Sequence, residues 1–428
     1  MATIEAEEPT FRRLALPLLL VVSAGCVSGS VPAAKPEVIP RPAPAPTSPE
    51  IRVGLLVGTT TVRVGGGDGL VVNQPDGSPV AMIPADQIWQ VSAGGHGLTL
   101  ISPAGWVSPP LDAMAIAPAD LAAPIRINGK RYRGMAELLW DRSGITVVNR
   151  VGMEEYLPGV VSAEMGRRSP VEQAALQAQA VVSRTYALRN LGRWRARGFD
   201  LSPSVADQVY GGLDGETPEG RAAVVETRGR VLTFNGALIE AFFYSTCGGR
   251  TANGVEVFKR ATQPYLRSVA DQAEDGAIYC SISPRYRWHE EWDAKALRAT
   301  LERNLEPVTG IRREDVGQVT DVRIIRRSAS GRVDQLGIVL GGPEIRVNGP
   351  AIRRVLRPAS GELLRSNAFT LVATGAGRRV THLAVDGMGS GHGVGFCQWG
   401  AVGRARAGQG FEQILRAYFP GTRLERRY

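Results

Sequence analysis

The chain has 428 residues, of which 43% are hydrophobic and 21% charged, with 50 basic and 41 acidic side chains and a net charge of +9. This is an ordinary composition for a globular protein and allows two or three domains. The basic residues are spread along the chain rather than interleaved with aromatic residues in a patch, which argues against a nucleic-acid partner. A modest positive charge suits a polyanionic partner. The alternative is that the many arginines only reflect the base composition of the genome.

The first residues are typical of an export signal. Arg12 and Arg13 precede the apolar run LALPLLLVVSAG, which is too short to span a bilayer but fits a signal peptide. Small residues then precede Cys26, as in the lipobox of bacterial lipoproteins, although Ser23 stands where Leu is usual. We therefore expect residues 1–26 to be a lipoprotein-type signal peptide and Cys26 to be acylated. The protein would then be anchored to the envelope membrane on its periplasmic side, facing the cell wall; a secreted protein is the alternative.

A tether and a β-rich region are expected next. Residues 27–50 are rich in Pro and Ala and predict a semi-rigid tether, so folded structure should begin near Ile51. Short runs rich in β-branched residues, separated by Gly, Asp and Ser turns, predict strands from there to about residue 150. We assign residues 51–120 to an N-terminal β-rich region.

Two helices follow these strands. MEEYLPGVVSAEM predicts a short helix that is interrupted near Pro158 and Gly159. Ser169 and Glu172 then form a capping box with Pro at the first helical position, which predicts a helix that runs to about residue 191. Glu164 is expected on the connection into that helix, where a rigid element can position a chemical group.

The second half of the chain predicts strands and an inserted lobe. VLTFNGALIEAFFYSTCGGRT predicts a hairpin with an Asn-Gly turn, whose second strand runs to the STCGG segment. Residues 293–365 predict an inserted α+β lobe, with helices near 293–304 and 348–356. A Gly-rich loop near the C-terminus leads into two more helices. The expected fold class is α+β, with residues 121–292 and 366–428 forming a mixed, β-rich core with a few packed helices.

Seven segments of this chain resemble motifs of the SpoIID/LytB family, named for stage II sporulation protein D. They stand in the family's order over roughly residues 125–424: VGMEEYLPGVVSAEM, EQAALQAQAVVSRTYAL, FFYSTCGGRT, YLRSV with SPRYRW, SGRV, LRSNAF and GHGVGFCQWGA. The resemblance implies a protein that acts on peptidoglycan. Some members are lytic transglycosylases that cleave glycan strands stripped of stem peptides, and others are described as enhancers of amidases.

The resemblance also implies a catalytic acid. The family's acid is the Glu of a Glu-Met-Pro motif, which matches Glu164, although Gly166 replaces the Pro. Such an acid protonates the leaving oxygen and then serves as base toward the muramic acid C6 hydroxyl, which attacks C1 and forms a 1,6-anhydro ring. A raised pKa would keep Glu164 protonated near neutral pH. The alternative is a surface acid without a catalytic role.

Other motif residues are candidates for binding the sugar chain, each with a structural alternative. Ser245 and Thr246 offer hydroxyls and Gly248 and Gly249 backbone amides, unless the segment is only a strand-end turn. Three further residues belong to the same set of candidates. They are His392, Gln398 and Arg184. The structural alternatives are a histidine that only holds a Gly-rich turn, a glutamine that only caps a helix, and an arginine in a buried ion pair.

Three cysteines besides Cys26 leave an odd number of thiols. Cys247, Cys280 and Cys397 could form one disulfide, such as Cys247–Cys280, with a free thiol, or a zinc site, since a metal has been seen in this family. No cofactor is required by the glycan chemistry. The expected partners are peptidoglycan glycan strands, a cell-wall amidase or other envelope proteins, and the membrane through the lipid anchor.

Overall fold

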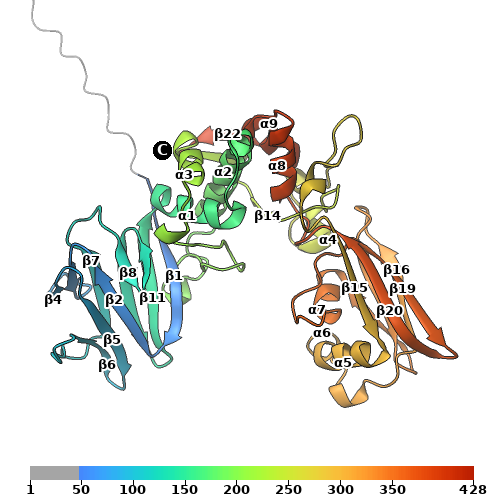
Figure 1. Ribbon diagram of the computed structural model, residues 1–428, viewed down its shortest axis with the longest axis horizontal. Helices are drawn as coiled ribbons and strands as arrows, with labels where there is room; N and C mark the ends of the chain where they lie inside the picture. Colours follow the sequence, from blue (N-terminus) through green and yellow to red (C-terminus); the bar gives the residue numbers. More distant parts are fainter. Residues whose placement is uncertain (1–47) are drawn as a thin grey trace, which may run out of the picture. The chain divides into compact units, whose positions relative to one another are not determined.

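The computed structural model describes residues 48–428 (Figure 1). The expected signal peptide, Cys26 and nearly all of the expected tether lie outside the described residues, so acylation stays a prediction. Among the helices of residues 48–428, none is long and apolar enough to cross a membrane. Several sheets and helices make up the fold, and the α+β class expected from the sequence is confirmed.

The N-terminal strands form two antiparallel sheets. Their strand orders are β1-β11-β10-β7-β3-β4 and β6-β5-β2-β8-β9. The strands are β1 (Glu50–Thr59), β2 (Thr61–Gly66), β3 (Leu70–Asn73), β4 (Pro79–Ile83), β5 (Ile88–Gly94), β6 (Gly97–Ile101), β7 (Ala113–Pro118), β8 (Ile125–Ile127), β9 (Lys130–Tyr132), β10 (Met135–Asp141) and β11 (Gly144–Gly152).

These sheets continue past residue 120, where the sequence suggested a boundary. The reason is strand pairing, because β7 and β10 lie side by side and β11 pairs with β1 through a register that joins Glu50 to Gly152. Side chains of β7 alternate between buried and half-buried positions, as expected for a strand with one face on the core. Nearly every residue of β11 is buried, and its apolar side chains belong to the same hydrophobic cluster as those of the following helix.

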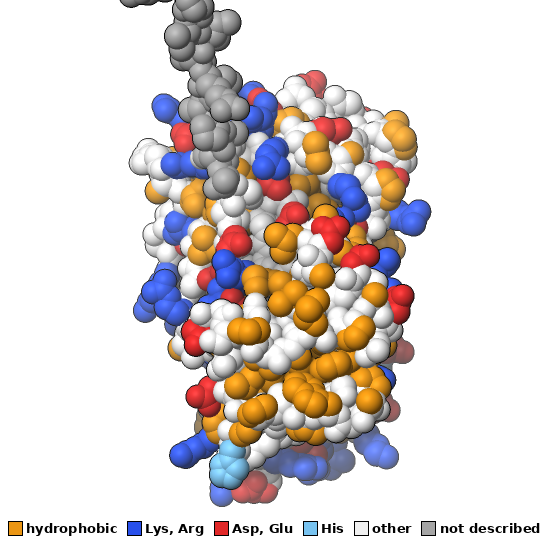
Figure 2. All heavy atoms as spheres, turned by 90° about the vertical axis from the view of Figure 1, so that its left-hand side faces the viewer, with side chains coloured by type: hydrophobic (Ala, Val, Ile, Leu, Met, Phe, Trp, Pro, Cys, Tyr) orange, Lys and Arg blue, Asp and Glu red, His pale blue; other side chains and the backbone are white. Residues whose placement is uncertain are grey.

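Hydrophobic side chains also gather on the outer face of this N-terminal region (Figure 2). Large exposed ones include Met82 in β4, Ile88 in β5 and Trp106 after β6. The rings of Trp89 and Trp106 lie 5.7 Å apart and form an aromatic pair there. The described part of the chain therefore exposes an apolar surface that is separate from the motifs of the family.

Helices α1 (Met153–Met165), α2 (Gln173–Arg189) and α3 (Pro218–Glu226) follow the sheets. The interruption expected in α1 is absent, since the helix continues through Pro158 and Gly159. Gly159 permits close packing there, because a Cβ at this position would lie 2.8 Å from the carbonyl oxygen of Gly212. The predicted capping box is present before α2, where the Glu172 carboxylate accepts the Ser169 N–H at 3.0 Å.

Helix α2 is the central helix of the described fold. It packs against α1, α3, α8 (Gln398–Arg406) and α9 (Phe411–Tyr418). Ala175, Ala178 and Ala180 in α2 are fully buried, and their small side chains let these helices approach closely. A helix that packs on most of its sides loses much of the amphipathic pattern of a surface helix.

The Asn-Gly hairpin is confirmed, but its second strand is shorter than expected. Asn235 and Gly236 have φ of 50° and 80°, as in a tight hairpin turn between β12 (Arg230–Phe234) and β13 (Ala237–Leu238). The chain then leaves the hairpin, and β14 (Phe243–Tyr244) pairs in parallel with β21 (Phe396–Cys397). This pairing brings the STCGG segment beside the GFCQW segment. On its other edge β12 pairs with β22 (Arg423–Arg426).

A second hydrophobic cluster lies in the region of the expected lobe. Its buried residues run from Trp288 to Val385, beyond the expected limits of 293 and 365, because the strands that flank the insertion pair with each other. The sheets are β15-β20-β19 and β16-β17-β18, and α5 packs against β15 and β20 (Figure 1). The elements are β15 (Arg287–Asp293), α5 (Ala294–Asn304), α6 (Glu306–Thr309), β16 (Asp321–Arg327), β17 (Val333–Val339), β18 (Glu344–Asn348), α7 (Ile352–Val355), β19 (Phe369–Ala376) and β20 (Arg379–Met388).

Short elements complete the chain. They are α4 (Gly254–Val257) and the 3-10 turns η1 (Pro170–Glu172), η2 (Arg195–Arg197), η3 (Leu213–Gly215), η4 (Pro264–Leu266), η5 (Tyr279–Ile282), η6 (Arg313–Asp315) and η7 (Gly349–Ala351). Of these, η5 carries one of the cysteines discussed below.

Candidate active site

Glu164 lies in the last turn of α1 rather than on a loop. The helix ends one residue later, and Gly166 follows with φ of 68°. Proline cannot adopt this conformation, because its ring holds φ near −65°. Gly166 therefore has a backbone conformation that the family's Pro could not adopt. Glu164 is held in place by α1, which contains it.

Two hydrogen-bond donors contact the Glu164 carboxylate, one on each oxygen. The backbone N–H of Val209 donates to Oε1 at 2.8 Å, and Nε2 of Gln398 donates to Oε2 at 3.2 Å. Burial raises the pKa of the Glu164 carboxyl, and these two hydrogen bonds oppose the rise in part. The net shift is upward, so the acid keeps its proton at higher pH than an exposed glutamate does.

The loop that supplies Val209 is held by its own buried side chains. Asp207 accepts hydrogen bonds from Trp194 Nε1 at 2.7 Å and from the Tyr186 hydroxyl at 3.1 Å. The neighbouring Gln208 is fully buried and donates to the carbonyl of Ser183 in α2. These contacts fix the backbone on which the Val209 N–H points at Glu164.

Gln398 reaches Glu164 from the first position of α8. Its Nε2 also approaches Oε1 of Gln179 at 3.5 Å, and Gln179 in turn donates to the Ser183 hydroxyl. Helices α1, α2 and α8 thus meet at the acid. The guanidinium of Arg168 lies 4.4 Å above the ring of Trp399, the residue after Gln398.

The hydroxyl residues of the STCGG segment lie next to this group. Trp399 donates its N–H to the Ser245 carbonyl at 3.0 Å, which ties the segment to the start of α8. The Thr246 hydroxyl is buried and shares a hydrogen bond of 2.8 Å with Ser283. Ser245 is half-buried and can offer a hydroxyl to a ligand, whereas Thr246 has a structural partner.

Gly248 lines an open cleft of about 620 Å³. Four arginines and one acid line this cleft, so its wall has a net positive charge; they are Arg250, Arg287, Arg327, Arg332 and Asp386. Gly248 and Gly249 have φ of 78° and 101°, a conformation that side chains disfavour. The N–H of Gly249 points at the Cys247 sulfur at 3.3 Å and is therefore not a free donor for sugar.

His392 occupies a structural position, the alternative given above. Its Nε2 donates to the Phe243 carbonyl at 2.8 Å and its Nδ1 accepts the Val394 N–H at 3.1 Å. Burial lowers the pKa of the imidazole to about 4, so the ring is neutral. With both nitrogens bonded to backbone, the imidazole has no free group for a sugar or for polarising a hydroxyl. The neighbouring Gly391 has no room for a Cβ, which would lie 2.7 Å from Tyr244.

Arg184 likewise forms the buried ion pair given as its alternative. Its guanidinium is fully buried and makes two bonds to the Glu154 carboxylate, at 2.7 and 2.8 Å. It also donates to the carbonyls of Val224 and Arg230. Arg184 therefore joins α2 to α1 and does not face a ligand.

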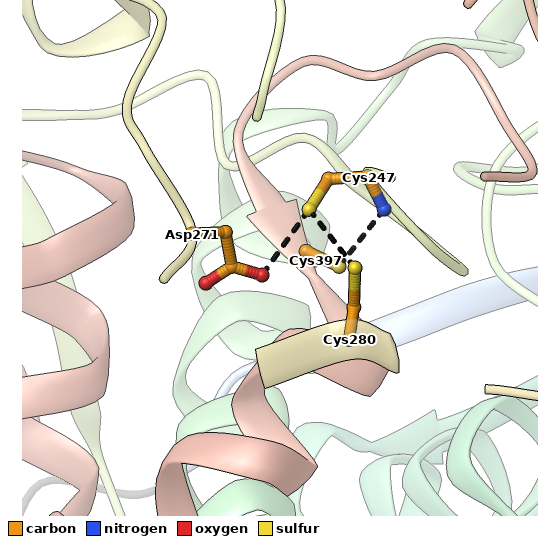
Figure 3. A group of neighbouring side chains, drawn as sticks. All are labelled: Cys247, Asp271, Cys280 and Cys397. Carbon is orange, nitrogen blue, oxygen red and sulfur yellow. Dashed lines mark hydrogen bonds between the residues drawn. The ribbon is translucent and has the colours of Figure 1, made fainter. Parts of the chain in front are cut away.

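The three remaining cysteines lie together. Cys247, Cys280 and Cys397 are buried free thiols, and the Cys247 and Cys280 sulfurs are 3.4 Å apart (Figure 3). A disulfide needs about 2.05 Å, so the Cys247–Cys280 bond, one of the two possibilities left open by the sequence, is not formed in this structure. Asp271 completes the group, with Oδ2 at 3.1 Å from the Cys247 sulfur.

Several of these residues have no signal in the sequence. Val209 acts through a backbone N–H in an irregular loop, and Gln179 is one of several polar residues in α2. The number of residues between Asp271 and the cysteines matches no known metal-binding motif. Gln398 was found through its motif, but its contact with Glu164 spans 234 residues and could not be read from local pattern.

Comparison with known proteins adds to this geometry. The SpoIID family, described as stage II sporulation protein, matches residues 141–234, which include Glu164. A domain of unknown function, DUF8618, matches residues 278–395, which include the region of the second hydrophobic cluster. Stage II sporulation protein D of Bacillus subtilis is 29% identical over 292 residues, or 65% of this chain and 75% of the relative.

The chain belongs to the SpoIID/LytB family. An uncharacterized protein of Brachyspira hyodysenteriae is 31% identical over 297 residues, covering 69% of this chain and 73% of that protein. A Bacillus subtilis protein named amidase enhancer is 27% identical over 349 residues. That match covers 73% of this chain but only 47% of the relative, so the chain spans about half of the amidase enhancer.

Proposed function

We propose that this protein cleaves the glycan strands of peptidoglycan as a lytic transglycosylase, with Glu164 as the general acid and base. The observation that carries the proposal is the setting of Glu164. The acid is half-buried with a raised pKa, and it lies between a backbone donor and Gln398 where three family motifs meet. Membership of the SpoIID/LytB family supports a role in the cell wall.

The chemistry needs one carboxyl group in two protonation states. Protonated Glu164 donates its proton to the glycosidic oxygen as the bond to C1 breaks. The carboxylate that remains then accepts the proton of the C6 hydroxyl as that oxygen bonds to C1, so the acid is regenerated and no water is consumed. Burial favours the neutral acid at the start, and the donors from Val209 and Gln398 stabilise the carboxylate that forms.

Sugar contacts are proposed for residues around the acid. The Ser245 hydroxyl is half-buried beside the start of α8; it shares one hydrogen bond of 3.2 Å with the Thr246 hydroxyl and keeps capacity for a second one with a sugar hydroxyl. The cleft lined by Gly248, Arg250 and Arg287 suits the carboxylates of muramic acid through its positive charge. A preference for strands stripped of stem peptides is part of the same proposal.

Replacing Glu164 tests the assignment. We expect Glu164→Gln to reduce release of 1,6-anhydro products from denuded glycan by roughly 10²–10⁴-fold, the usual contribution of general acid–base catalysis. The amide keeps the volume of the side chain and lacks only the titrating proton. Product release is measured by mass spectrometry of the soluble fragments.

A matched control comes from the same helix. Glu155 is an exposed acid in the first turn of α1, so Glu155→Gln should retain full activity. Both variants should show the thermal unfolding profile of the wild type. Full activity of Glu164→Gln would show that Glu164 is not the acid of this reaction.

A second candidate is a glycan-binding protein that stimulates a partner amidase. The match to a protein named amidase enhancer favours it. Such a protein needs the binding surface but not the acid. Stimulation of an added cell-wall amidase to the same extent by Glu164→Gln and wild type, with no glycan cleavage by either, would establish this alternative.

We place the protein in the envelope, facing the cell wall. The lipobox-like segment before Cys26 supports a lipid anchor, although it lies outside the described residues. A fatty-acid analogue should label the wild type and not Cys26→Ser, and an unlabelled wild type would point to a secreted or soluble periplasmic protein.

A further inference from the structure

Four buried side chains from separate segments converge below the start of α8. They are Cys247 after β14, Asp271 in the following loop, Cys280 in η5 and Cys397 at the end of β21 (Figure 3). One ligand atom from each, three sulfurs and a carboxylate oxygen, all lie within 4.8 Å of one another. In the part of the chain that the structure describes, this cluster is the one with such a set of metal-ligating groups.

The spacing fits one tetrahedral metal ion. With Zn–S bonds of about 2.3 Å, two sulfurs of a tetrahedral site lie about 3.8 Å apart. The Cys247 and Cys280 sulfurs are 3.4 Å apart, and Asp271 Oδ2 is 3.1 Å from the Cys247 sulfur. The sulfur–sulfur separation is a few tenths of an ångström shorter than that value, and no two ligand atoms of the group are more than 4.8 Å apart, so a bound ion requires only small shifts of side chains.

The surroundings of the sulfurs also resemble those of metal thiolates. Backbone N–H groups point at them, from Gly249 to Cys247 at 3.3 Å, and from Cys247 and Gly400 to Cys397 at 3.1 and 3.2 Å. Donors of this kind stabilise negatively charged sulfur and orient metal ligands.

Asp271 is held so that one oxygen remains for the ion. Its Oδ1 accepts hydrogen bonds from the Tyr418 hydroxyl at 2.7 Å and from Arg404 Nε at 3.0 Å. Its Oδ2 faces the sulfurs. The Arg404 charge also offsets part of the excess negative charge that three thiolates and a carboxylate would carry around a divalent ion.

We propose that Cys247, Asp271, Cys280 and Cys397 bind a single Zn²⁺ ion in a closed structural site. Three soft sulfur ligands select zinc over Mg²⁺ or Ca²⁺, which prefer oxygen. Four protein ligands leave no open position for a reacting water, which is typical of structural zinc. An iron–sulfur cluster distributes its cysteines over several iron atoms and needs a wider group of sulfurs.

The ion would join three parts of the chain beside the candidate active site. Cys397 immediately precedes Gln398, whose amide bonds Glu164, and Cys247 follows the Ser245–Thr246 pair. On binding, the ion would displace the protons of the thiols to solvent, as thiolate coordination requires. Of the two possibilities that the sequence left open for these cysteines, the proposal takes the zinc site over the disulfide.

Metal content of the purified full-length chain tests the proposal. Elemental mass spectrometry should find one Zn²⁺ per wild-type chain after dialysis against metal-free buffer. Cys280→Ser and Cys397→Ser should lose the ion. Asp271→Asn should weaken zinc affinity roughly 10-fold or more in competition with a chelating dye. Cys26→Ser is the matched control, because this fourth cysteine lies outside the cluster, and it should keep the ion.

A measurement on the wild type keeps the test independent of how the variants fold. Reconstitution with Co²⁺ should produce a thiolate-to-cobalt charge-transfer band and the visible bands of tetrahedral cobalt. Unfolding in metal-free denaturant should then expose all three thiols of the cluster, Cys247, Cys280 and Cys397, as counted in the Cys26→Ser chain. Iron in place of zinc, zinc content unchanged in Cys280→Ser, no metal uptake by the wild type, or a single reactive thiol left by a disulfide in Cys26→Ser would each overturn the proposal.

Discussion

At the scale of single residues, the protonation of Glu164 depends on opposing effects. Burial raises the pKa of its carboxyl, and hydrogen bonds from Val209 and Gln398 lower it by a smaller amount. Because the folded pKa is above the unfolded one, the stability that this group contributes is present below the unfolded pKa, about 4.3, and is lost as pH rises through the folded pKa. Activity that needs the protonated acid should fall on the alkaline side over the same range.

Replacing Gln398 separates its contact with the acid from a contact with sugar. Gln398→Leu removes a donor to the carboxylate, so the pKa of Glu164 should rise and the alkaline limb of kcat/KM should move to higher pH. We expect kcat at the optimum to fall about 10-fold, since a looser acid transfers its proton less well. Gln177→Leu, on the exposed side of α2, should change neither quantity.

A purely sugar-binding role for Gln398 has a different signature. KM would rise, kcat would stay constant and the alkaline limb would not move. That pattern would exclude the proposed contact with Glu164 as a catalytic feature.

The sequence singled out Glu164 as the candidate acid and left two roles open for His392 and for Arg184. Glu164 was identifiable because a motif marks its position. His392 and Arg184 are also in motifs, yet a motif does not say whether a side chain faces a ligand or its own backbone. Both side chains make their hydrogen bonds within the protein. His392 bonds the backbone of Phe243 and Val394, and Arg184 bonds the Glu154 carboxylate.

At the scale of secondary-structure elements, the buried ion pair between Glu154 and Arg184 joins α1 to α2. Burial acts to raise the pKa of Glu154, but its hydrogen bonds with Arg184 and the charge of Arg184 outweigh this and lower it. Tyr428, the last residue, donates its hydroxyl to the same carboxylate at 2.6 Å. Since the folded pKa is depressed, this stabilisation is present above the unfolded pKa and is lost as pH falls through the folded one.

Removing the charge of Glu154 should leave the buried Arg184 guanidinium without a charged partner, with only the backbone carbonyls of Val224 and Arg230 to accept from it. We expect Glu154→Gln to lower the free energy of unfolding by roughly 3–5 kcal/mol, the usual cost of breaking a buried pair from one side. Denaturant unfolding at neutral pH measures this. Glu155→Gln, one residue away and exposed, should change stability by less than about 0.5 kcal/mol. Equal stability of the two variants would show that the pair is not important for folding.

The helices show where local sequence rules succeed. The capping box before α2 depends on neighbouring residues only, and it was predicted. Helix α1 was expected to break near Pro158 and Gly159, because both residues disfavour helices locally. Tertiary packing decides the outcome instead, since Gly159 gives room for the carbonyl of Gly212, which lies far along the chain.

At the scale of the whole molecule, one buried arginine joins the two hydrophobic clusters. Arg332 lies in the SGRV motif, is 6% exposed and donates to the carbonyls of Cys247 and Arg250 at 2.9 Å each. Nearby, the Glu256 carboxylate accepts hydrogen bonds from Ser328 and Ser330. These long-range contacts could not be read from the sequence, although the motif itself was recognised.

Loss of Arg332 should therefore weaken the link between the clusters. We expect Arg332→Ala to lower Tm and to split thermal unfolding into two transitions in calorimetry, since each cluster keeps its own buried core. Arg346→Ala, at an exposed position in β18, should leave a single transition at the wild-type Tm. A wild-type profile for Arg332→Ala would mean that other contacts hold the clusters together.

The most direct measurement of the central claim is the identity of the new glycan end. Denuded glycan is incubated with the protein in water labelled with oxygen-18, and the fragments are analysed by mass spectrometry. Attack by the C6 hydroxyl, with Glu164 as acid and base, predicts 1,6-anhydro ends that carry no label and are absent with Glu164→Gln. Labelled reducing ends, or intact glycan after incubation with the wild type, would contradict it.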